Sequence, residues 1–242
     1  MTLFITSSPY IDGADRAILN PQNELIDRLR TVLPQNPRAV FVCSHPDSHD
    51  MTCHFGADTA AAFCLAGMAF SSYAVLDGQN MEDAAFLIEN SDLIVFAGGH
   101  VPTQNDFLHD CGLRELLEDY EGVVMGISAG SMNLADEVYA QPEEPGESDP
   151  EFERFIPGLG LTDVNILPHY QKVKDNILDE QRLYEDITFA DSWNHCFFAL
   201  PDGSWIYQDE EELTLLGEAY MIRNGVIELL TLDGETLDLS VL

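Results

Sequence analysis

The stretch Val123-Val124-Met125-Gly126-Ile127-Ser128-Ala129-Gly130-Ser131 joins an apolar run of strand type to a short segment, residues 132–135, that is compatible with a helix. Its Gly-x-Ser-x-Gly core places a serine at the sharp turn between the two, and the small glycines let strand and helix approach closely. This layout is typical of a nucleophile elbow, which holds a serine hydroxyl above a sheet. A plain strand-to-helix turn without chemistry has the same local pattern, so the rest of the chain must decide.

Strand-like apolar runs alternate with helical segments along the first half of the chain. This alternation predicts an α/β fold built on a mostly parallel sheet with helices on both faces. Near the C-terminus the turns at 201–203, 223–225 and 232–234 instead predict antiparallel strands. We expect a single domain over residues 1–242. The predicted strands are 3–7, 38–43, 73–76, 93–96, 123–125 and a run ending at 167, and the predicted helices are 22–33, 57–70, 81–89, 105–120 and 178–187.

The chain of 242 residues has 43 acidic and 10 basic side chains, which give a formal net charge of −33. This charge disfavours nucleic acids and anionic membranes as partners, because both are polyanions. No apolar run reaches the roughly 18–20 residues of a membrane span, and the N-terminus lacks the pattern of a signal peptide. Five scattered cysteines indicate a reducing compartment, so we expect a cytoplasmic protein. The acidic excess fits adaptation to high salt and the general habit of one genome equally well.

A serine nucleophile needs a base, an orienting acid and an oxyanion hole. His169 ends a predicted strand, which is where α/β sheets build sites, and Asp202 is a candidate to orient its imidazole. The amides of Gly98, Gly99 and Ala129 are candidate donors to an oxyanion. Each residue also has an ordinary interpretation, His169 as a partly exposed polar residue and the others as turn residues.

Six potential metal ligands follow the second predicted strand: Cys43, His45, Asp47, His49, Cys53 and His54. Their spacings match no closed zinc pattern such as paired Cys-x-x-Cys. We therefore expect no metal site here and expect the segment to form part of the pocket wall. The acidic, proline-broken segment 141–153 is interpreted as a solvated connection, with a lid over the site as the alternative.

Four blocks of sequence follow one another along the chain: IVFAGG at 94–99, GISAG at 126–130, LPHY at 167–170 and LPDGSWI at 200–206. In order and rough spacing they resemble the peptidase E and cyanophycinase family, which are serine peptidases on a class I glutamine-amidotransferase-like fold. The order Ser, His, acid also differs from the Ser, acid, His order of α/β-hydrolases. The resemblance implies a dipeptidase-like hydrolase of small peptides that needs no metal or organic cofactor, with a homodimer as one assembly open to it.

Carried over by position, the resemblance makes Ser128 the nucleophile and His169 the base, and it places Asp202 where aspartyl dipeptidases have a glutamate. Gly98 or Gly99, together with Ala129, matches the oxyanion-hole amides. The segment that begins at His100 departs from the family's usual loop, which shapes the substrate site. Aspartyl dipeptidases bind the substrate carboxylate with basic groups after the histidine. The candidates for that role here are Lys172, Lys174 and Arg182.

Two other functions are open on the sequence. An amidotransferase-like glutaminase normally uses a cysteine at the elbow, whereas this chain has Ser128. A relative of the fold that binds a ligand without turnover is motivated by Asp202 in place of glutamate and by the altered loop at His100. The leading hypothesis is a serine peptidase with a Ser128–His169–Asp202 triad, acting on small peptides with an N-terminal aspartyl residue as the candidate preference.

Overall fold

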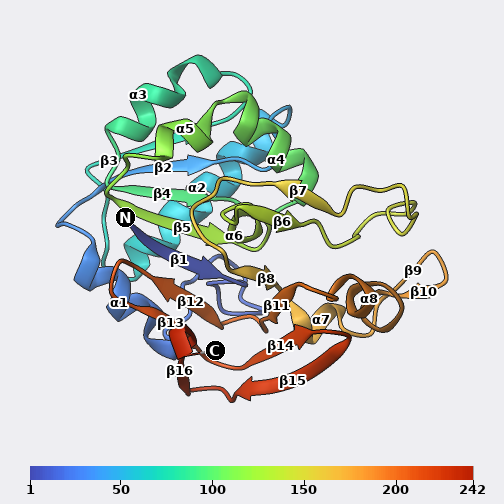
Figure 1. The fold of residues 1–242 in the computed structure, drawn as a ribbon. Helices are drawn as coiled ribbons and strands as arrows, with labels where there is room; N and C mark the ends of the chain where they lie inside the picture. Colours follow the sequence, from blue (N-terminus) through green and yellow to red (C-terminus); the bar gives the residue numbers. More distant parts are fainter. Residues whose placement is uncertain (242) are drawn as a thin grey trace.

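The computed structural model describes residues 1–241, and its central feature is an eight-stranded sheet (Figure 1). Five of its strands, β1, β5, β4, β2 and β3, are parallel to one another, and β12, β13 and β16 pair antiparallel to their neighbours. This arrangement confirms the predicted fold class. The spatial order is β16 (Thr236–Asp238), β13 (Leu213–Leu216), β12 (Trp205–Gln208), β1 (Thr2–Thr6), β5 (Val123–Ile127), β4 (Leu93–Phe96), β2 (Arg38–Val42) and β3 (Ser72–Leu76).

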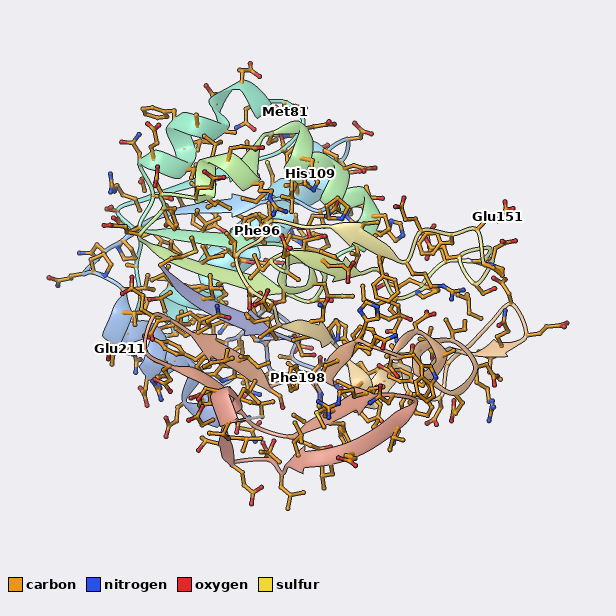
Figure 2. The ribbon with its side chains drawn as sticks, viewed as in Figure 1. Met81, Phe96, His109, Glu151, Phe198 and Glu211 are labelled. Atoms are coloured by element: carbon orange, nitrogen blue, oxygen red, sulfur yellow. The ribbon has the colours of Figure 1, made fainter. Side chains whose placement is uncertain are left out.

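Helices cover both faces of this sheet because successive strand residues point to opposite sides. In β2, Phe41 packs into one core with Phe63, whereas Val40 belongs to the core on the other face. Phe96 is fully buried in that second core (Figure 2). The helices of the first face are α1 (Leu25–Val32) and α2 (His49–Leu65), and those of the second are α3 (Ala84–Glu89), α4 (Val101–Asp110) and α5 (Leu113–Leu117).

The C-terminal part of the chain is divided between the central sheet and a second, four-stranded sheet. Asn224 and Gly225, with φ of 53° and 76°, close a hairpin between two strands of the second sheet, as their sequence predicts. The turns at 201–203 and 232–234 instead carry the chain from one sheet to the other, so they are not hairpins. The second sheet has the order β15 (Val226–Thr231), β14 (Ala219–Arg223), β11 (Cys196–Ala199) and β8 (Asn165–Leu167).

Two predicted helices differ from the observed ones in their limits. The helix predicted over 57–70 runs from His49 to Leu65, so it takes in the second half of the histidine- and cysteine-rich segment. The helix predicted over 105–120 is two helices, because Gly112 has a φ of 64° and ends the first one. Local periodicity located both segments, but it did not locate their ends.

The prediction of one helix over 178–187 is wrong for its first half. Residues 177–182 form a small hairpin, β9 (Ile177–Leu178) and β10 (Gln181–Arg182), whose turn residues Asp179 and Glu180 have φ of 48° and 67°. The Asp179 carboxylate accepts hydrogen bonds from Gly146 N and Ser148 Oγ, both at 2.8 Å, and these tertiary contacts stabilise the turn. Helical structure begins only with η3 (Leu183–Thr188) and α8 (Phe189–Asp191).

The remaining elements are short and connect the main ones. They are η1 (Gln22–Glu24), η2 (Met81–Asp83), α6 (Ala129–Met132), β6 (Glu137–Tyr139), β7 (Phe155–Pro157), α7 (Tyr170–Val173) and η4 (Leu239–Val241).

None of the helices within residues 1–241 has the length and apolar character needed to cross a lipid bilayer.

Candidate active site

Ser128 lies at the junction of β5 and α6 in a strained backbone conformation, with φ of 52° and ψ of −115°. A residue with a side chain rarely adopts a positive φ, and such strain is concentrated at functional sites. The Ser128 amide donates to the carbonyls of Thr6 and Ser7 at 3.1 and 3.0 Å, which fixes the turn against the end of β1. The serine is therefore held in an elbow, and its hydroxyl is only partly covered.

The two glycines of the motif are required by close packing. A Cβ atom on Gly126 would lie 2.4 Å from Ser131 Cα, and one on Gly130 would lie 2.4 Å from the Phe96 carbonyl oxygen. Both distances are too short for any side chain. The Gly-x-Ser-x-Gly pattern thus has a structural cause, because α6 starts directly against β4 and β5.

His169 follows β8 and lies beside the elbow. Its backbone has a left-handed φ of 58°, and its amide donates to Ser7 Oγ at 2.8 Å. The Nε2 atom is 2.9 Å from Ser128 Oγ, which is hydrogen-bond distance for a base that accepts the serine proton. The His169 side chain is one-third exposed, so part of the imidazole is open to solvent.

Asp202 completes a continuous chain of contacts from Ser128. Its Oδ1 lies 2.6 Å from His169 Nδ1, so the Nδ1–H tautomer donates to the carboxylate and leaves Nε2 as the acceptor. Ser7 Oγ donates to the same oxygen at 3.1 Å, and the Asp202 amide donates to Gln171 Oε1 at 3.1 Å. The expected distance between the imidazole and the carboxylate is therefore present with aspartate in place of glutamate.

Lys172 pairs with Asp202, the aspartate that contacts His169. Its Nζ is 2.8 Å from Asp202 Oδ2 and 2.9 Å from Asp12 Oδ1, and these contacts raise the pKa of Lys172. Burial opposes ionisation of Asp202, but its contacts with His169 and Lys172 hold its pKa well below the usual value. These contacts therefore favour the charged form of the carboxylate that faces His169.

The candidate oxyanion donors lie around Ser128. Ser44 Oγ donates to the Gly98 carbonyl at 2.6 Å. Because the C=O and N–H of a trans peptide point in opposite directions, this contact directs the Gly99 N–H away from Ser44. Within residues 1–241, neither Gly99 N nor Ala129 N donates to a backbone carbonyl. Both amides are therefore available to an oxygen atom that develops negative charge.

The segment after Tyr139 packs beside this site and protrudes from it, with Glu151 near its outer end (Figure 2). Glu147 accepts from the amides of residues 143 and 144 and lies 2.8 Å from His100 Nε2. Although part of Glu143 reaches solvent, packing around its carboxyl group raises its pKa, against the opposing influence of His100 and His169. Neither sequence interpretation is complete, because the outer residues are a solvated connection and the inner ones form a wall of the site.

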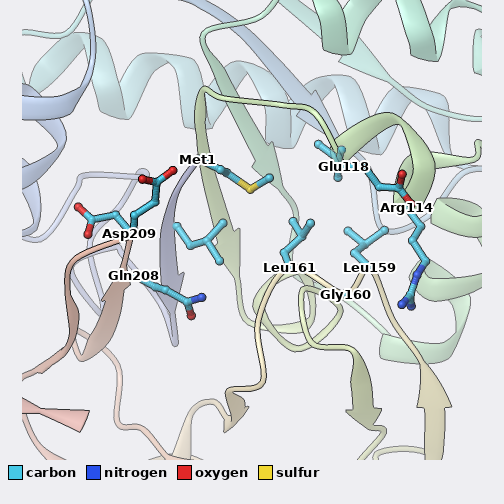
Figure 3. Close-up of a pocket in the computed structure, with 11 residues that line it drawn as sticks. Met1, Arg114, Glu118, Leu159, Gly160, Leu161, Gln208 and Asp209 are labelled. Carbon is cyan, nitrogen blue, oxygen red and sulfur yellow. The ribbon is translucent and has the colours of Figure 1, made fainter. Parts of the chain in front are cut away.

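Two hollows lie near Ser128: one is lined by His169, and the other by Ile127, which precedes Ser128 in the chain. One, of about 360 Å³, is lined by His169, Met132 and Glu143 together with residues of the β9–β10 hairpin. The other, of about 320 Å³, is mainly apolar and reaches Gly98 and Ile127. A larger cavity of about 450 Å³ lies around Met1 and Arg114, and it contains no triad residue (Figure 3).

The three predicted substrate-binding cations do not form one anion pocket. Lys172 is occupied by two carboxylates, as described above. Arg182 is exposed and pairs with Asp186 of its own segment. Lys174 is exposed at the end of α7. A carboxylate, that of Glu143, lines the hollow next to His169 instead.

The fold places the candidate metal ligands between Cys43 and His54 in different surroundings. Cys43 is buried, and burial together with the charge of Asp77 raises the pKa of its thiol to about 12. His45 lies next to Gly99, where its Cε1 atom would be 2.9 Å from an added Cβ, so this part does border the site. His54 is exposed and pairs with Asp58. Only two of the six residues, His49 and Cys53, lie close together, in company with Asp77.

Sequence reasoning missed four residues around the triad: Ser7, Ser44, Gln171 and Glu143. Ser7 comes directly after β1, and Ser44 comes two residues after β2. Because sites in α/β proteins form at the carboxyl ends of parallel strands, this rule could have indicated both serines. Gln171 and Glu143 have no such signal, because their positions depend on how the loops after β8 and β6 fold back.

Comparison with known proteins agrees with this geometry. Residues 3–216 match peptidase family S51. A crystal structure described as a "Putative Peptidase E Protein" from Listeria monocytogenes EGD-e shares the fold, with a TM-score of 0.59 and 16% identity over 95% of this chain and 98% of that one. No curated protein gives a significant match. Since the family match spans most of its length, the chain belongs to peptidase family S51 and is a serine-type peptidase.

Proposed function

We propose that this peptidase hydrolyses small peptides with Ser128 as nucleophile, His169 as general base and acid, and Asp202 as the group that orients the imidazole. The observation that carries the proposal is the unbroken chain of contacts from Ser128 Oγ through His169 to Asp202, at 2.9 and 2.6 Å. Its location on a strained elbow, with unused amides next to it, supports the same conclusion.

The reaction follows from these positions. Ser128 Oγ forms a bond to the substrate carbonyl carbon while its proton passes to His169 Nε2. The Gly99 and Ala129 amides donate to the oxyanion of the tetrahedral intermediate. His169 then returns the proton to the leaving amine as the C–N bond breaks, which leaves an acyl-enzyme. Water, deprotonated by His169, attacks the ester and releases the carboxylic acid product and Ser128.

Asp202 makes this cycle efficient without taking up the proton itself. Its carboxylate keeps the imidazole in the Nδ1–H tautomer and stabilises the imidazolium that forms when Ser128 attacks. Ser7 supports the arrangement at two points, since its hydroxyl accepts from the His169 amide and donates to Asp202.

The substrate preference is the finer part of the proposal. An N-terminal aspartyl preference, implied by the family resemblance, has little support from the contacts, because Lys172 and Arg182 are paired with carboxylates. Glu143 in the hollow beside His169 would repel an anionic side chain and attract a cationic group. We propose that this hollow takes a neutral or positively charged part of the peptide, such as its free amino end.

A dipeptide panel tests the proposal. Neutral, lysyl, aspartyl, isoaspartyl and glutamyl N-terminal residues are compared, with wild type and Ser128→Ala side by side at low and high salt. We expect wild type to cleave neutral or basic members faster than aspartyl ones, and Ser128→Ala to cleave none. Cleavage that survives in Ser128→Ala would overturn the mechanism. Preferential cleavage of aspartyl peptides would keep the mechanism and overturn the proposed preference.

A further inference from the structure

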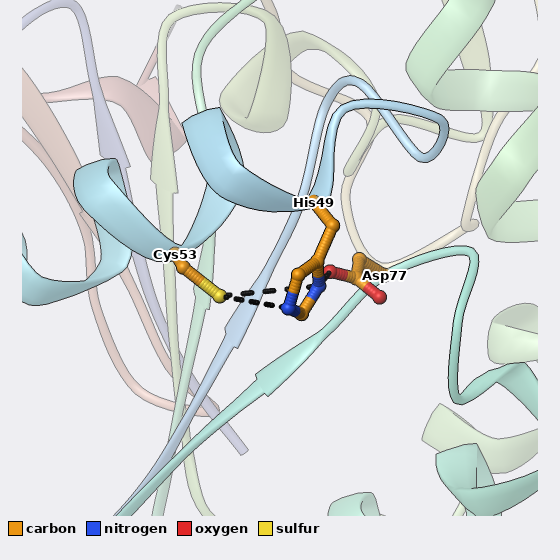
Figure 4. Close-up of side chains that lie close together, drawn as sticks. All are labelled: His49, Cys53 and Asp77. Carbon is orange, nitrogen blue, oxygen red and sulfur yellow. Dashed lines mark hydrogen bonds and ion pairs between the residues drawn. The ribbon is translucent and has the colours of Figure 1, made fainter.

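A second group of chemically active side chains lies two strands away from Gly98 along the sheet edge. His49 is the first residue of α2 and Cys53 lies one turn further on, so both side chains lie on one face of the helix. Asp77 directly follows β3 and faces them from the sheet (Figure 4). The candidate ligand atoms of the three residues lie within 4.8 Å of one another.

The distances suit a tetrahedral metal ion between the histidine and the cysteine. His49 Nε2 and Cys53 Sγ are 3.5 Å apart. With ordinary Zn–N and Zn–S bonds of about 2.05 and 2.3 Å, that separation gives an N–Zn–S angle of about 107°, close to the tetrahedral value. Because Cys53 Sγ is also 3.9 Å from His49 Nδ1, it lies beside the imidazole and not along the Nε2 lone pair, so a rotation of the Cys53 side chain must accompany binding.

Asp77 occupies the supporting position that metal-binding histidines normally have. Its Oδ2 is 2.6 Å from His49 Nδ1, which favours the Nδ1–H tautomer and leaves Nε2 as the nitrogen that can bind a metal. The side chain of Asp77 is only 2% exposed, and its second oxygen accepts from Gln79 N at 2.9 Å. Within residues 1–241 no lysine or arginine pairs with it, so a buried negative charge faces the pair of ligands.

The ligand atoms are accessible to an ion from solvent. The His49 side chain is 42% exposed, and Cys53 is a free thiol that is partly exposed. Soft sulfur and imidazole nitrogen together favour zinc over magnesium or calcium. We propose that His49 Nε2 and Cys53 Sγ bind a zinc ion, that Asp77 orients His49 from behind, and that water completes the tetrahedron. Binding displaces the Cys53 thiol proton to solvent as the Zn–S bond forms.

This site is separate from the proposed hydrolytic one, so its test uses metal binding and not turnover. Chelator-treated wild type is titrated with Zn²⁺ and with Co²⁺ at high salt, which screens the acidic surface. We expect one ion per chain and a thiolate-to-cobalt charge-transfer band. Cys53→Ser should remove the band, His49→Ala should abolish tight binding, and Asp77→Asn should weaken it about 10- to 100-fold. Cys64→Ser and His54→Ala, on the same helix, are the matched controls and should bind as wild type does.

Alkylation of wild type gives a second measurement that does not depend on any variant folding. Zn²⁺ should slow the reaction of Cys53 with iodoacetamide and leave that of the exposed Cys64 unchanged. Binding with no charge-transfer band, or equal binding in Cys53→Ser, would mean ions held only by the acidic surface and would overturn the site. Absence of stoichiometric binding in wild type would overturn it as well.

Discussion

Two aspartate–histidine pairs in this molecule have the same internal geometry and different surroundings. His169 Nδ1 lies 2.6 Å from Asp202, and His49 Nδ1 lies 2.6 Å from Asp77. In both, the carboxylate is almost fully buried and the imidazole is partly exposed. The pairs differ in the group near Nε2 of the histidine, which is Ser128 Oγ in one and Cys53 Sγ in the other. They also differ in the backbone that carries this group.

The backbone decides which pair supports a nucleophile. Ser128 lies on a strained elbow, 2.9 Å from its histidine, beside backbone amides that have no backbone acceptor within residues 1–241. Cys53 lies inside α2, 3.5 Å from its histidine, where neighbouring amides already donate within the helix. The amide of Cys53 is therefore not free to stabilise an oxyanion. The comparison indicates that an Asp–His pair supports acyl transfer only when a nucleophile on a strained elbow lies beside it. A histidine and a cysteine on one face of a helix are better suited to bind a metal ion.

The largest expected effect is at the nucleophile. Ser128→Ala removes the only oxygen that His169 can activate, so we expect kcat/KM to fall roughly 10⁴- to 10⁶-fold. Steady-state hydrolysis of the best panel peptide measures it, with circular dichroism to confirm folding. A loss smaller than tenfold would show that another group, Cys53 included, carries the reaction.

Substitution of the two aspartates should give the next largest effect, and it tests each pair for the function proposed for the other. Asp202→Asn leaves the shape of the site but favours the wrong imidazole tautomer, so kcat should fall about 10³- to 10⁴-fold. Asp77→Asn should weaken zinc binding and leave hydrolysis unchanged. If Asp77→Asn lowered kcat as strongly as Asp202→Asn does, the two sites would not be independent.

Lys172 distinguishes the pairs further, since only Asp202 has a cation beside it. Lys172→Met removes a contact that lowers the pKa of Asp202, so the carboxylate takes up a proton at a higher pH than in wild type. We expect kcat/KM to fall up to about tenfold, because Asp202 is then held less firmly against His169. Lys174→Met, which changes the neighbouring exposed lysine, is the control. Equal kcat/KM for wild type and Lys172→Met would contradict a positioning role.

The smallest effect concerns selectivity beside His169. Glu143→Gln removes a negative charge from the hollow, so cleavage of an aspartyl peptide relative to a neutral one should rise about fivefold, for about 1 kcal/mol. Because the pKa of Glu143 is raised, the same relative gain should develop in wild type as pH falls toward that pKa, and Glu143→Gln should not show it. Glu144→Gln is the matched control. Equal selectivity in all three proteins would remove Glu143 from the substrate site.

Much of this fold follows from local patterns in the sequence. The apolar runs at 93–96 and 123–125 are strands, and the motif around Ser128 requires glycines because α6 packs directly against β4 and β5. The hairpin over 177–182 could not be predicted, because contacts from Asp179 to a distant loop override its helical periodicity. Local pattern therefore predicts elements well where burial is regular and poorly where single tertiary hydrogen bonds decide.

The site shows the same division. Ser128, His169 and Asp202 are located by motifs at the ends of elements, and the fold brings them into contact. The sequence predicts that Lys172 binds substrate, whereas the structure shows it in contact with Asp202. That contact could not be predicted, because it depends on the one-turn helix after His169. Asp77 gave no signal at all, because it joins His49 and Cys53 only through the pairing of β2 with β3.

The most direct test of the central claim is labelling of wild type with a fluorophosphonate, which reacts with activated serines, followed by peptide mapping. The account predicts one label per chain, at Ser128, lost in His169→Ala and retained in His54→Ala. Labelling at another residue, or labelling of Ser128 that persists without His169, would contradict the claim that the Ser128–His169–Asp202 contacts form the catalytic unit.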